Sequence, residues 1–220
     1  MKTIKTLIVD DHFLMVEGYK SVLSYSLVYD VSIVTALNCE QCYYILNRRS
    51  DTVLFDLVIL DLALPPFPAQ GIYSGEQLAP IIRMRLPQTK LVIITSHAEG
   101  FKLYDIIKKV NPDGLMVKSD FTADEFLQAF ESIIQGSKHY SKTVLKHLKT
   151  LGTSEKYLDT YNRLIISYLA QGILTKNLPD YLPLSMSAID KRKSQIRDWF
   201  SLEKGSDEDI IRAAKKFGYI

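Results

Sequence analysis

The chain has 220 residues, a hydrophobic fraction of 47% and a formal net charge of +2, which fit one large or two small globular domains with a real core. Its longest apolar runs are strand-length, well short of the roughly 20 residues of a membrane-spanning helix, and the first run begins too early to leave room for a signal peptide, so we expect a cytoplasmic protein with no membrane partner. Basic and acidic residues balance over residues 1–149, so the small positive excess lies in the last third and hints at a nucleic-acid partner.

Strands and helices are predicted to alternate five times up to about residue 136. Short apolar runs rich in β-branched residues predict strands over 6–9, 31–35, 57–60, 91–95 and 115–117. Helical periodicity predicts helices over 13–26, 38–48, 76–85, 100–110 and 122–135, the last with Thr122 as its N-cap and Gly136 beyond its end. Alternating units of this kind predict an α/β fold with a doubly wound, five-stranded parallel sheet and right-handed crossovers.

The pattern changes after residue 136. Residues 137–154 are polar and are expected to form a linker, which Val144, Leu145 and Leu148 could make partly helical. Helices are then predicted over 155–170, 185–200 and 207–217, with a short one around 178–182. The chain therefore divides into an α/β domain over residues 1–136, a linker over 137–154 and a smaller all-α domain over 155–220.

Cys39 and Cys42 are the two cysteines, at a spacing that occurs in zinc and redox motifs. They fall in a predicted helix, and no further cysteine completes a set of metal ligands. The favoured interpretation is a pair of reduced cysteines in a helix.

Three carboxylates come at the ends of predicted strands. Asp10 and Asp11 follow the run Leu7–Val9, and Asp61 follows the run Leu57–Leu60. Chemistry in parallel sheets gathers outside the carboxyl ends of the strands, so these acids should share one pocket. Like charges this close need a counter-charge, and Mg2+ suits a site that offers a few carboxylates and open water positions.

Two further strand ends supply groups that complement the acids. Thr95 ends the fourth run, and Lys118 follows the fifth. A phosphoryl group requires such neighbours, because a cation and a lysine neutralise its oxygens and a hydroxyl donates a hydrogen bond to it. Asp61 would then be the nucleophile, forming an acyl phosphate.

These residues, with Leu64-Pro65 shortly after Asp61, make the first domain resemble the receiver domain of two-component response regulators, which has a flavodoxin-like fold. The resemblance implies that Asp61 is the phosphoacceptor and that Thr95 and Lys118 contact the phosphate. It also implies a Mg2+ site formed by Asp10, Asp11, Asp61 and the backbone carbonyl of Ala63. Ser96, which follows Thr95, is counted with Thr95 and Lys118 among the expected phosphate-binding residues. Its hydroxyl could narrow access to the site or affect hydrolysis of the acyl phosphate.

One position departs from the receiver pattern. Receivers usually carry Tyr or Phe three residues before the lysine, where rotation of the ring reports phosphorylation, whereas this chain has Leu115. Leucine offers neither a rotating ring nor a hydroxyl. Tyr104 or Phe101 would have to substitute for it, or the receiver would act independently of phosphorylation.

The last third resembles the LuxR-type helix-turn-helix output domain of the NarL/FixJ response regulators. The residues that carry this resemblance are Ala170-Gln171-Gly172, Thr175-Lys176, Leu184-Ser185, Ala188-Ile189 and Ile196. In a recognition helix that starts at Ser185, the apolar side chains expected to pack inward are Ile189, Ile196 and Phe200. Phosphate contacts supply most of the affinity of such modules, and Lys191 is the best candidate for a base edge. The residues expected to bind DNA are Ser187, Lys191, Arg192, Lys193, Ser194 and Arg197, and the same face also carries Asp190 and Asp198.

Two residues depart from the output pattern. Asp190 repels phosphate unless it accepts a hydrogen bond from a cytosine amino group. Pro179 falls inside the expected scaffold helix, so Asn177 should cap a helix of barely more than one turn.

Together these features indicate a response regulator of the NarL/FixJ type that a sensor histidine kinase phosphorylates on Asp61. The phosphorylated form is expected to become a homodimer and to bind double-stranded DNA. The chain accepts a phosphoryl group covalently but is not expected to be a turnover enzyme. The alternatives are a receiver whose degenerate output domain acts through protein contacts, a receiver independent of phosphorylation, and a phosphatase-like hydrolase that uses the same acidic pocket.

Overall fold

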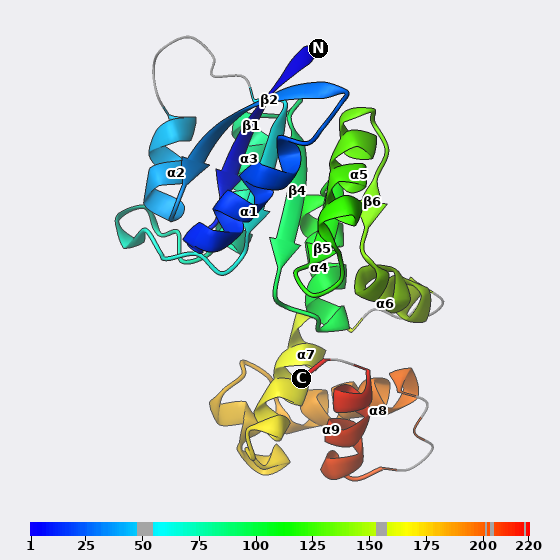
Figure 1. Ribbon diagram of the computed structural model, residues 1–220. Coiled ribbons are helices and arrows are strands. Elements are labelled where there is room, and N and C mark those ends of the chain that lie inside the picture. Colours follow the sequence, from blue (N-terminus) through cyan, green and yellow to red (C-terminus); the bar gives the residue numbers. More distant parts are fainter. Residues whose placement is uncertain (48–54, 153–157, 201, 203–204, 218) are drawn as a thin grey trace. The chain divides into compact units, whose positions relative to one another are not determined.

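The computed structural model describes residues 1–47, 55–152, 158–200, 202, 205–217 and 219–220. The chain divides into two compact units, one built from Met1–Ala98 and Leu103–Lys146 and the other from Glu99–Lys102 and His147–Ile220. The first unit contains a sheet, and the second is helical (Figure 1). Within the described ranges, no helix combines the length and the hydropathy that crossing a membrane requires.

A parallel sheet of six strands forms the centre of the first unit, in the order β2-β1-β3-β4-β5-β6. The strands are β1 (Lys2–Val9), β2 (Tyr29–Ala36), β3 (Leu57–Asp61), β4 (Lys90–Thr95), β5 (Gly114–Val117) and β6 (His139–Tyr140). The helices are α1 (Phe13–Leu23), α2 (Cys39–Leu46), α3 (Gly75–Arg85), α4 (Gly100–Val110), α5 (Ala123–Ile134) and α6 (Lys142–Gly152), with a 3-10 turn, η1 (Pro68–Gln70). This arrangement confirms the predicted doubly wound α/β fold.

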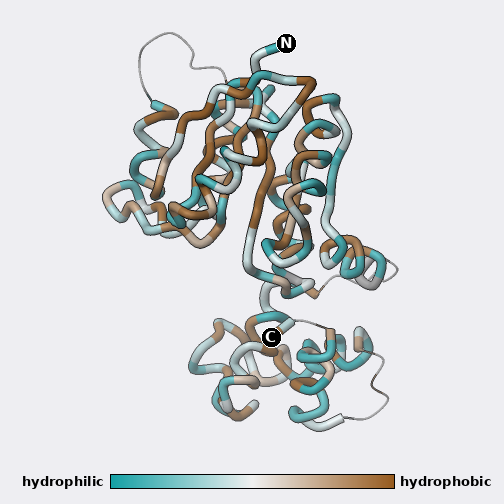
Figure 2. The backbone as a smooth tube through the Cα atoms, viewed as in Figure 1, coloured by the Kyte–Doolittle hydropathy of each residue, from teal (hydrophilic) through white to brown (hydrophobic). Residues whose placement is uncertain are grey.

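The central strands are buried on both faces of the sheet. Every residue of β3 is buried, and the strands form continuous hydrophobic paths in Figure 2. The register places Val58 between Leu7 of β1 and Leu91 of β4. On one face α1 and α5 pack together, and the rings of Tyr19 and Phe126 lie 5.1 Å apart. Because all these strands run in the same direction, their carboxyl ends meet at one edge.

The prediction of five strands is corrected by β6. His139 and Tyr140 pair in parallel with Gly114 and Leu115, and the Ser141 N–H continues this ladder to the Leu115 carbonyl at 3.0 Å. A strand of two half-buried residues has no hydrophobic run to mark it. The segment over 137–154 that was expected to be a partly helical linker thus contains an edge strand, β6, and a helix, α6, which includes Val144, Leu145 and Leu148.

Cys39 and Cys42 are free thiols buried in α2, as the sequence indicates. Burial raises the pKa of the Cys42 thiol to about 12, which keeps it protonated and weakly nucleophilic at neutral pH. The pair therefore packs as small apolar side chains.

The second unit contains α7 (Thr160–Ala170), a 3-10 helix η2 (Thr175–Asp180), α8 (Met186–Trp199) and α9 (Asp207–Lys216). Ser185 caps α8 and Ser206 caps α9, each accepting a backbone N–H three residues later at 3.3 Å. The core is apolar and includes Ile165, Ile166, Leu169, Leu178, Ile189, Ile196, Phe200 and Ile210. The burial of Ile189, Ile196 and Phe200 confirms their predicted inward orientation.

Two expectations for this unit are corrected. The first helix begins at Thr160, where Asp159 is its N-cap, rather than at residue 155, and residues 155–157 lie outside the described part. The scaffold element is a 3-10 helix from Thr175 to Asp180 that contains Pro179, rather than a helix capped by Asn177. Proline has no N–H to complete a longer helical ladder, which favours a short 3-10 segment here.

Candidate functional site

Four strands bring the predicted pocket residues to one edge of the sheet. Asp10 follows β1, Asp61 and Thr95 are the last residues of β3 and β4, and Lys118 follows β5. Asp10, Asp61 and Thr95 are 1%, 2% and 0% exposed, respectively. Burying two carboxylates with little solvent requires a compensating charge nearby.

Lys118 supplies that charge. Its Nζ donates to Oδ2 of Asp61 at 2.7 Å and to Oδ2 of Asp10 at 3.0 Å. Burial by itself lowers the pKa of Lys118, but the hydrogen bonds and charges of Asp61 and Asp10 outweigh it, so the pKa is raised above 10.5. The ammonium therefore stays charged and bridges the two acids.

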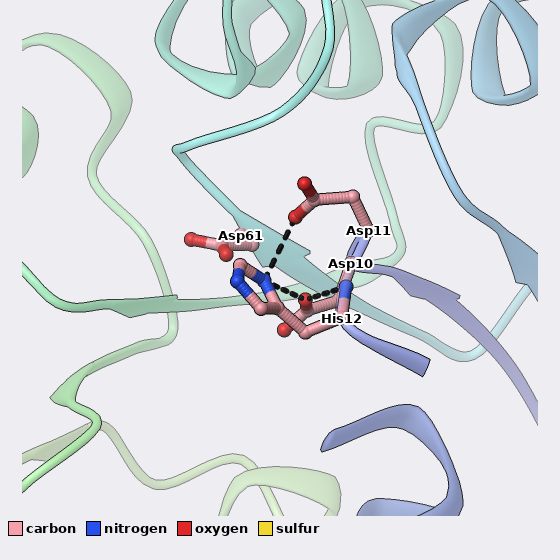
Figure 3. Close-up of side chains that lie close together, drawn as sticks. All are labelled: Asp10, Asp11, His12 and Asp61. Carbon is pink, nitrogen blue, oxygen red and sulfur yellow. Dashed lines mark hydrogen bonds and ion pairs between the residues drawn. The ribbon is translucent and has the colours of Figure 1, made fainter. Parts of the chain in front are cut away.

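His12 extends the pocket beyond the predicted residues. Its Nδ1 lies 3.2 Å from Oδ1 of Asp10 and 2.9 Å from Oδ1 of Asp11, and its backbone N–H donates to Oδ1 of Asp10 at 2.9 Å. Figure 3 shows the imidazole beside Asp61 as well as beside the acid pair. One potential ligand atom from each of Asp10, Asp11, His12 and Asp61 falls within 4.8 Å of the others, so this cluster could hold a metal ion.

The backbone after Asp61 is held close to α3. Oδ1 of Asp61 accepts the Ala63 N–H at 3.2 Å, and the Gly75 N–H donates to the Leu62 carbonyl at 2.9 Å. A Cβ at Gly75 would lie 2.1 Å from the Asp61 carbonyl oxygen, so a side chain at this position would displace the loop. The glycine that begins α3 therefore positions the backbone of Asp61, a role that the sequence pattern did not single out.

Thr95 and Ser96 differ in their surroundings. Thr95 is fully buried, and its Oγ1 accepts the His97 N–H at 3.0 Å, whereas Ser96 is exposed. The Lys118 N–H donates to the Thr95 carbonyl at 2.8 Å, which ties the ends of β4 and β5 together. Both hydroxyls therefore lie at the edge where the acids lie.

Leu115 is fully buried inside β5 and offers no polar atom at the site. Of the two residues considered as substitutes, Tyr104 is partly exposed, with the Lys108 Nζ 5.5 Å from its ring centroid. The side chain of Phe101 lies outside the described part. An aromatic ring that the sequence did not suggest is Tyr19, which is 4% exposed and whose hydroxyl has no hydrogen-bond partner among the residues that the structure describes.

The second unit presents a polar face on α8. Five side chains of this face are exposed, as predicted: Ser187, Asp190, Lys191, Ser194 and Asp198. Arg197 on the flank is partly exposed. The face is therefore mixed in charge, because it carries one lysine and two carboxylates.

Two basic residues expected to reach DNA point elsewhere. Lys193 is 9% exposed, and its Nζ bonds Oγ1 of Thr175 at 2.7 Å and pairs with Asp207. Arg192 donates to Oδ1 of Asp159 at 2.7 Å and to Oδ1 of Asn162 at 3.0 Å. Both cations are engaged inside the unit and hold α8 against its neighbours, and the expectation that they bind phosphates stays a prediction.

Comparisons with known proteins agree with this architecture. The model of the response regulator receiver domain matches residues 6–131. The oxygen regulatory protein NreC of Staphylococcus epidermidis is 24% identical, over 96% of this chain and 97% of its own, and that of Staphylococcus aureus is 22% identical over the same shares.

Solved structures share the fold over nearly the whole chain. A structure of two RcsB dimers bound to two parallel DNAs has a TM-score of 0.67 at 18% identity, covering 97% of this chain and 98% of that one. RcsB of Salmonella enterica serovar Typhimurium, bound to a promoter in the presence of the phosphomimetic BeF3−, also has a TM-score of 0.67, at 17% identity and covering 96% and 97%. Both likenesses include the sheet unit and the helical unit.

Proposed function

This chain belongs to the response regulator receiver family and is a response regulator of the NarL/FixJ type with a DNA-binding output domain, and from that premise we propose that phosphorylation of Asp61 controls its dimerisation and its binding to double-stranded DNA. The observation that carries the proposal is the pair of buried carboxylates, Asp61 and Asp10, bridged by Lys118 at 2.7 and 3.0 Å. A charged ammonium fixed beside a buried nucleophile is suited to stabilising a phosphoryl group.

The chemistry follows from these groups. The Asp61 carboxylate attacks the phosphorus of a phosphohistidine on a sensor histidine kinase, a P–O bond forms, the P–N bond breaks, and the imidazole leaves. The Lys118 ammonium then pairs with a phosphoryl oxygen, and the Thr95 hydroxyl donates to another once it turns from His97. The transfer occurs once per chain, so the protein acts as a switch and not as a turnover enzyme.

The donor set fits Mg2+, because it consists largely of carboxylate oxygens at a position open to water. Asp10, Asp11, Asp61 and the Ala63 carbonyl would hold the ion, which neutralises phosphoryl oxygens when bound. Lys118 and this cation would both neutralise the charge of the phosphoryl group.

DNA binding rests on the exposed face of α8. Ser187, Lys191 and Ser194 are the residues proposed to face the major groove, with Arg197 placed to reach a phosphate. A homodimer would present two such helices to a two-fold operator. RcsB, whose fold this chain shares, has been solved as dimers on DNA.

A second candidate, an output unit that binds protein, is favoured by one observation. Lys193 and Arg192 are engaged internally, while Asp190 and Asp198 are exposed on the same helix. A face with fewer cations and two acids binds DNA less strongly than its sequence suggests.

One experiment tests the proposal as a whole. Wild type and Asp61→Asn are treated with a small phosphodonor and Mg2+, and phosphate content, oligomeric state and binding to genomic fragments at several salt concentrations are measured together. We expect one phosphoryl group per wild-type chain, a shift to dimer and a gain in DNA affinity, with Asp61→Asn unchanged in all three. Phosphorylation without salt-sensitive DNA binding would favour the protein-binding candidate, and repeated release of phosphate would favour a hydrolase.

A further inference from the structure

We propose that His12 is a ligand of the cation pocket and that its imidazole shifts the preference of this pocket from Mg2+ toward transition-metal ions such as Co2+. The inference rests on the proposed function, since it concerns the same pocket. It adds a nitrogen ligand to a set otherwise made of oxygen atoms.

The distances fit a shared ion. Adjacent ligands of an octahedral ion with bonds of about 2.1 Å lie about 3 Å apart. The Nδ1 of His12 lies 2.9 Å from Oδ1 of Asp11 and 3.2 Å from Oδ1 of Asp10, which are the separations of neighbouring ligands on one ion. In Figure 3 the ring projects toward the centre of the group that Asp10, Asp11 and Asp61 form.

Local structure holds His12 in this place. Its backbone N–H donates to Oδ1 of Asp10 at 2.9 Å, and Asp10 is in turn fixed by Lys118 through its other oxygen at 3.0 Å. The His12 carbonyl accepts the Met15 N–H at 2.9 Å, so its backbone is also part of the start of α1. The backbone of His12 is therefore held on both sides by hydrogen bonds. Its side chain is 61% exposed, so the imidazole is accessible from solvent.

The chemistry of imidazole gives the pocket a preference. A neutral imidazole with its proton on Nε2 presents the Nδ1 lone pair to an ion. Mg2+ favours oxygen ligands, whereas imidazole suits later first-row ions, whose affinity rises from Mn2+ through Co2+ to Ni2+. His12 should therefore add affinity for Co2+ and almost none for Mg2+.

The test compares two metals at one pH. Metal-free wild type, His12→Ala and His12→Gln are titrated calorimetrically with Mg2+ and with Co2+, and the ratio of the two affinities is the readout. Glutamine supplies an oxygen ligand of similar reach and so separates loss of nitrogen from loss of a side chain. Asp10→Asn shows that the measured Co2+ lies in the pocket, and His147→Ala controls for a histidine elsewhere.

We expect both His12 variants to lose at least tenfold in Co2+ affinity, which is about 1.4 kcal/mol, while their Mg2+ affinity changes less than twofold. The proton spectrum of the Co2+-loaded wild type should contain a contact-shifted, exchangeable imidazole resonance that is absent from His12→Ala. An unchanged affinity ratio with Mg2+ still bound would overturn the inference alone and leave His12 a hydrogen-bonding partner of the acids. Failure of wild type to bind either metal would overturn the cation pocket itself and the inference with it.

Discussion

The Nζ of Lys118 lies 2.7 Å from Oδ2 of Asp61, and this ion pair joins residues 57 positions apart at the edge of the sheet. The same ammonium lies 3.0 Å from Asp10, so a single cation balances two carboxylates whose side chains are 1% and 2% exposed. The pocket therefore carries an excess of negative charge, and its stability should depend on what else neutralises it.

Removing the ammonium should destabilise the sheet unit unless a metal replaces it. We expect Lys118→Met to lower the free energy of unfolding by about 3 kcal/mol without divalent cations, because breaking a buried ion pair leaves unpaired charges. Mg2+ should recover part of this loss and should stabilise the variant more than wild type. Urea unfolding followed by far-UV circular dichroism, in EDTA and in Mg2+, measures both effects.

Lys142→Met is the matched control, because its partner Glu125 lies 3.1 Å away at the surface, where ion pairs contribute little. Equal losses of unfolding free energy in the two variants would mean that the Lys118 ion pairs stabilise the fold no more than a surface ion pair does. Absence of a larger Mg2+ effect in Lys118→Met would mean that ammonium and metal do not balance the same charge.

Asp120, two residues after Lys118, anchors the start of α6. Its carboxylate accepts the Thr143 N–H at 2.8 Å, the Thr143 hydroxyl at 2.8 Å and the Ser141 hydroxyl at 2.6 Å. Burial by itself raises the pKa of Asp120, but these hydrogen bonds outweigh it and the pKa is lowered, which keeps the carboxylate ionised. The loop that carries Lys118 is thus tied to the helix that follows β6.

We expect Asp120→Ala to loosen the first turn of α6 by about 1 kcal/mol, the usual effect of losing a helix N-cap. That corresponds to an increase of about fivefold in amide hydrogen exchange over this turn, measured by mass spectrometry on the full chain. Asp124→Ala, an exposed acid in the first turn of α5, serves as control. Similar exchange of α6 in both variants would show that Asp120 does not anchor it.

Most of the fold was predictable because its signals are local. Apolar runs of β-branched residues marked the five longer strands, and Thr122 marked the start of α5, where the structure shows that it forms a capping box with Glu125. The edge strand β6 was not predicted, and the short helix expected around 178–182 is instead the 3-10 helix η2 over Thr175–Asp180. The strand β6 has only two residues, which is too short to show a periodic pattern. The type of helix that forms around Pro179 depends on the residues packed against it, which the local sequence does not specify.

The pocket was predictable because strand ends fix where a short side chain lies. Asp10, Asp61, Thr95 and Lys118 therefore meet as expected, although their roles stay predictions. His12 was missed although it directly follows the acid pair. The burial of Lys193 was not expected, because helical periodicity gives the direction of a Cα–Cβ bond but not the partner of a long, flexible side chain, which here is Asp207 on the next helix.

Lys191 and Lys193 lie two residues apart on α8, and we expect replacement of the first to change DNA affinity and replacement of the second to change stability. Lys191 is exposed, so Lys191→Ala should weaken DNA binding at least tenfold without lowering stability. Lys193 is buried against Thr175 and Asp207, so Lys193→Met should cost about 1–3 kcal/mol of stability by leaving a carboxylate unpaired. Gel shifts over a range of salt, and urea unfolding monitored by Trp199 fluorescence, separate the two. A stable Lys193→Met that loses DNA binding in the same way as Lys191→Ala would support the expectation that Lys193 binds DNA.

Acid should destabilise the helical unit through Asp207. Burial by itself raises the pKa of Asp207, but hydrogen bonds from Lys193 and Thr175 and the positive charges of Lys193 and Arg197 outweigh it, so the pKa in the folded chain lies below its ordinary 3.8. A carboxyl with a lowered folded pKa stabilises the fold above the unfolded pKa and loses that contribution as pH falls through the folded value. Between pH 7 and pH 5 the contribution is therefore constant, and below about pH 4 it declines.

The midpoint of urea unfolding, followed by Trp199 fluorescence from pH 7 to pH 3, should fall at the acidic end in wild type. Asp207→Asn should begin from a lower midpoint at pH 7 and fall less, whereas Asp198→Asn, which replaces an exposed acid of α8, should retain the wild-type slope. If Asp207→Asn keeps that slope too, the acid sensitivity of this unit arises from other carboxylates.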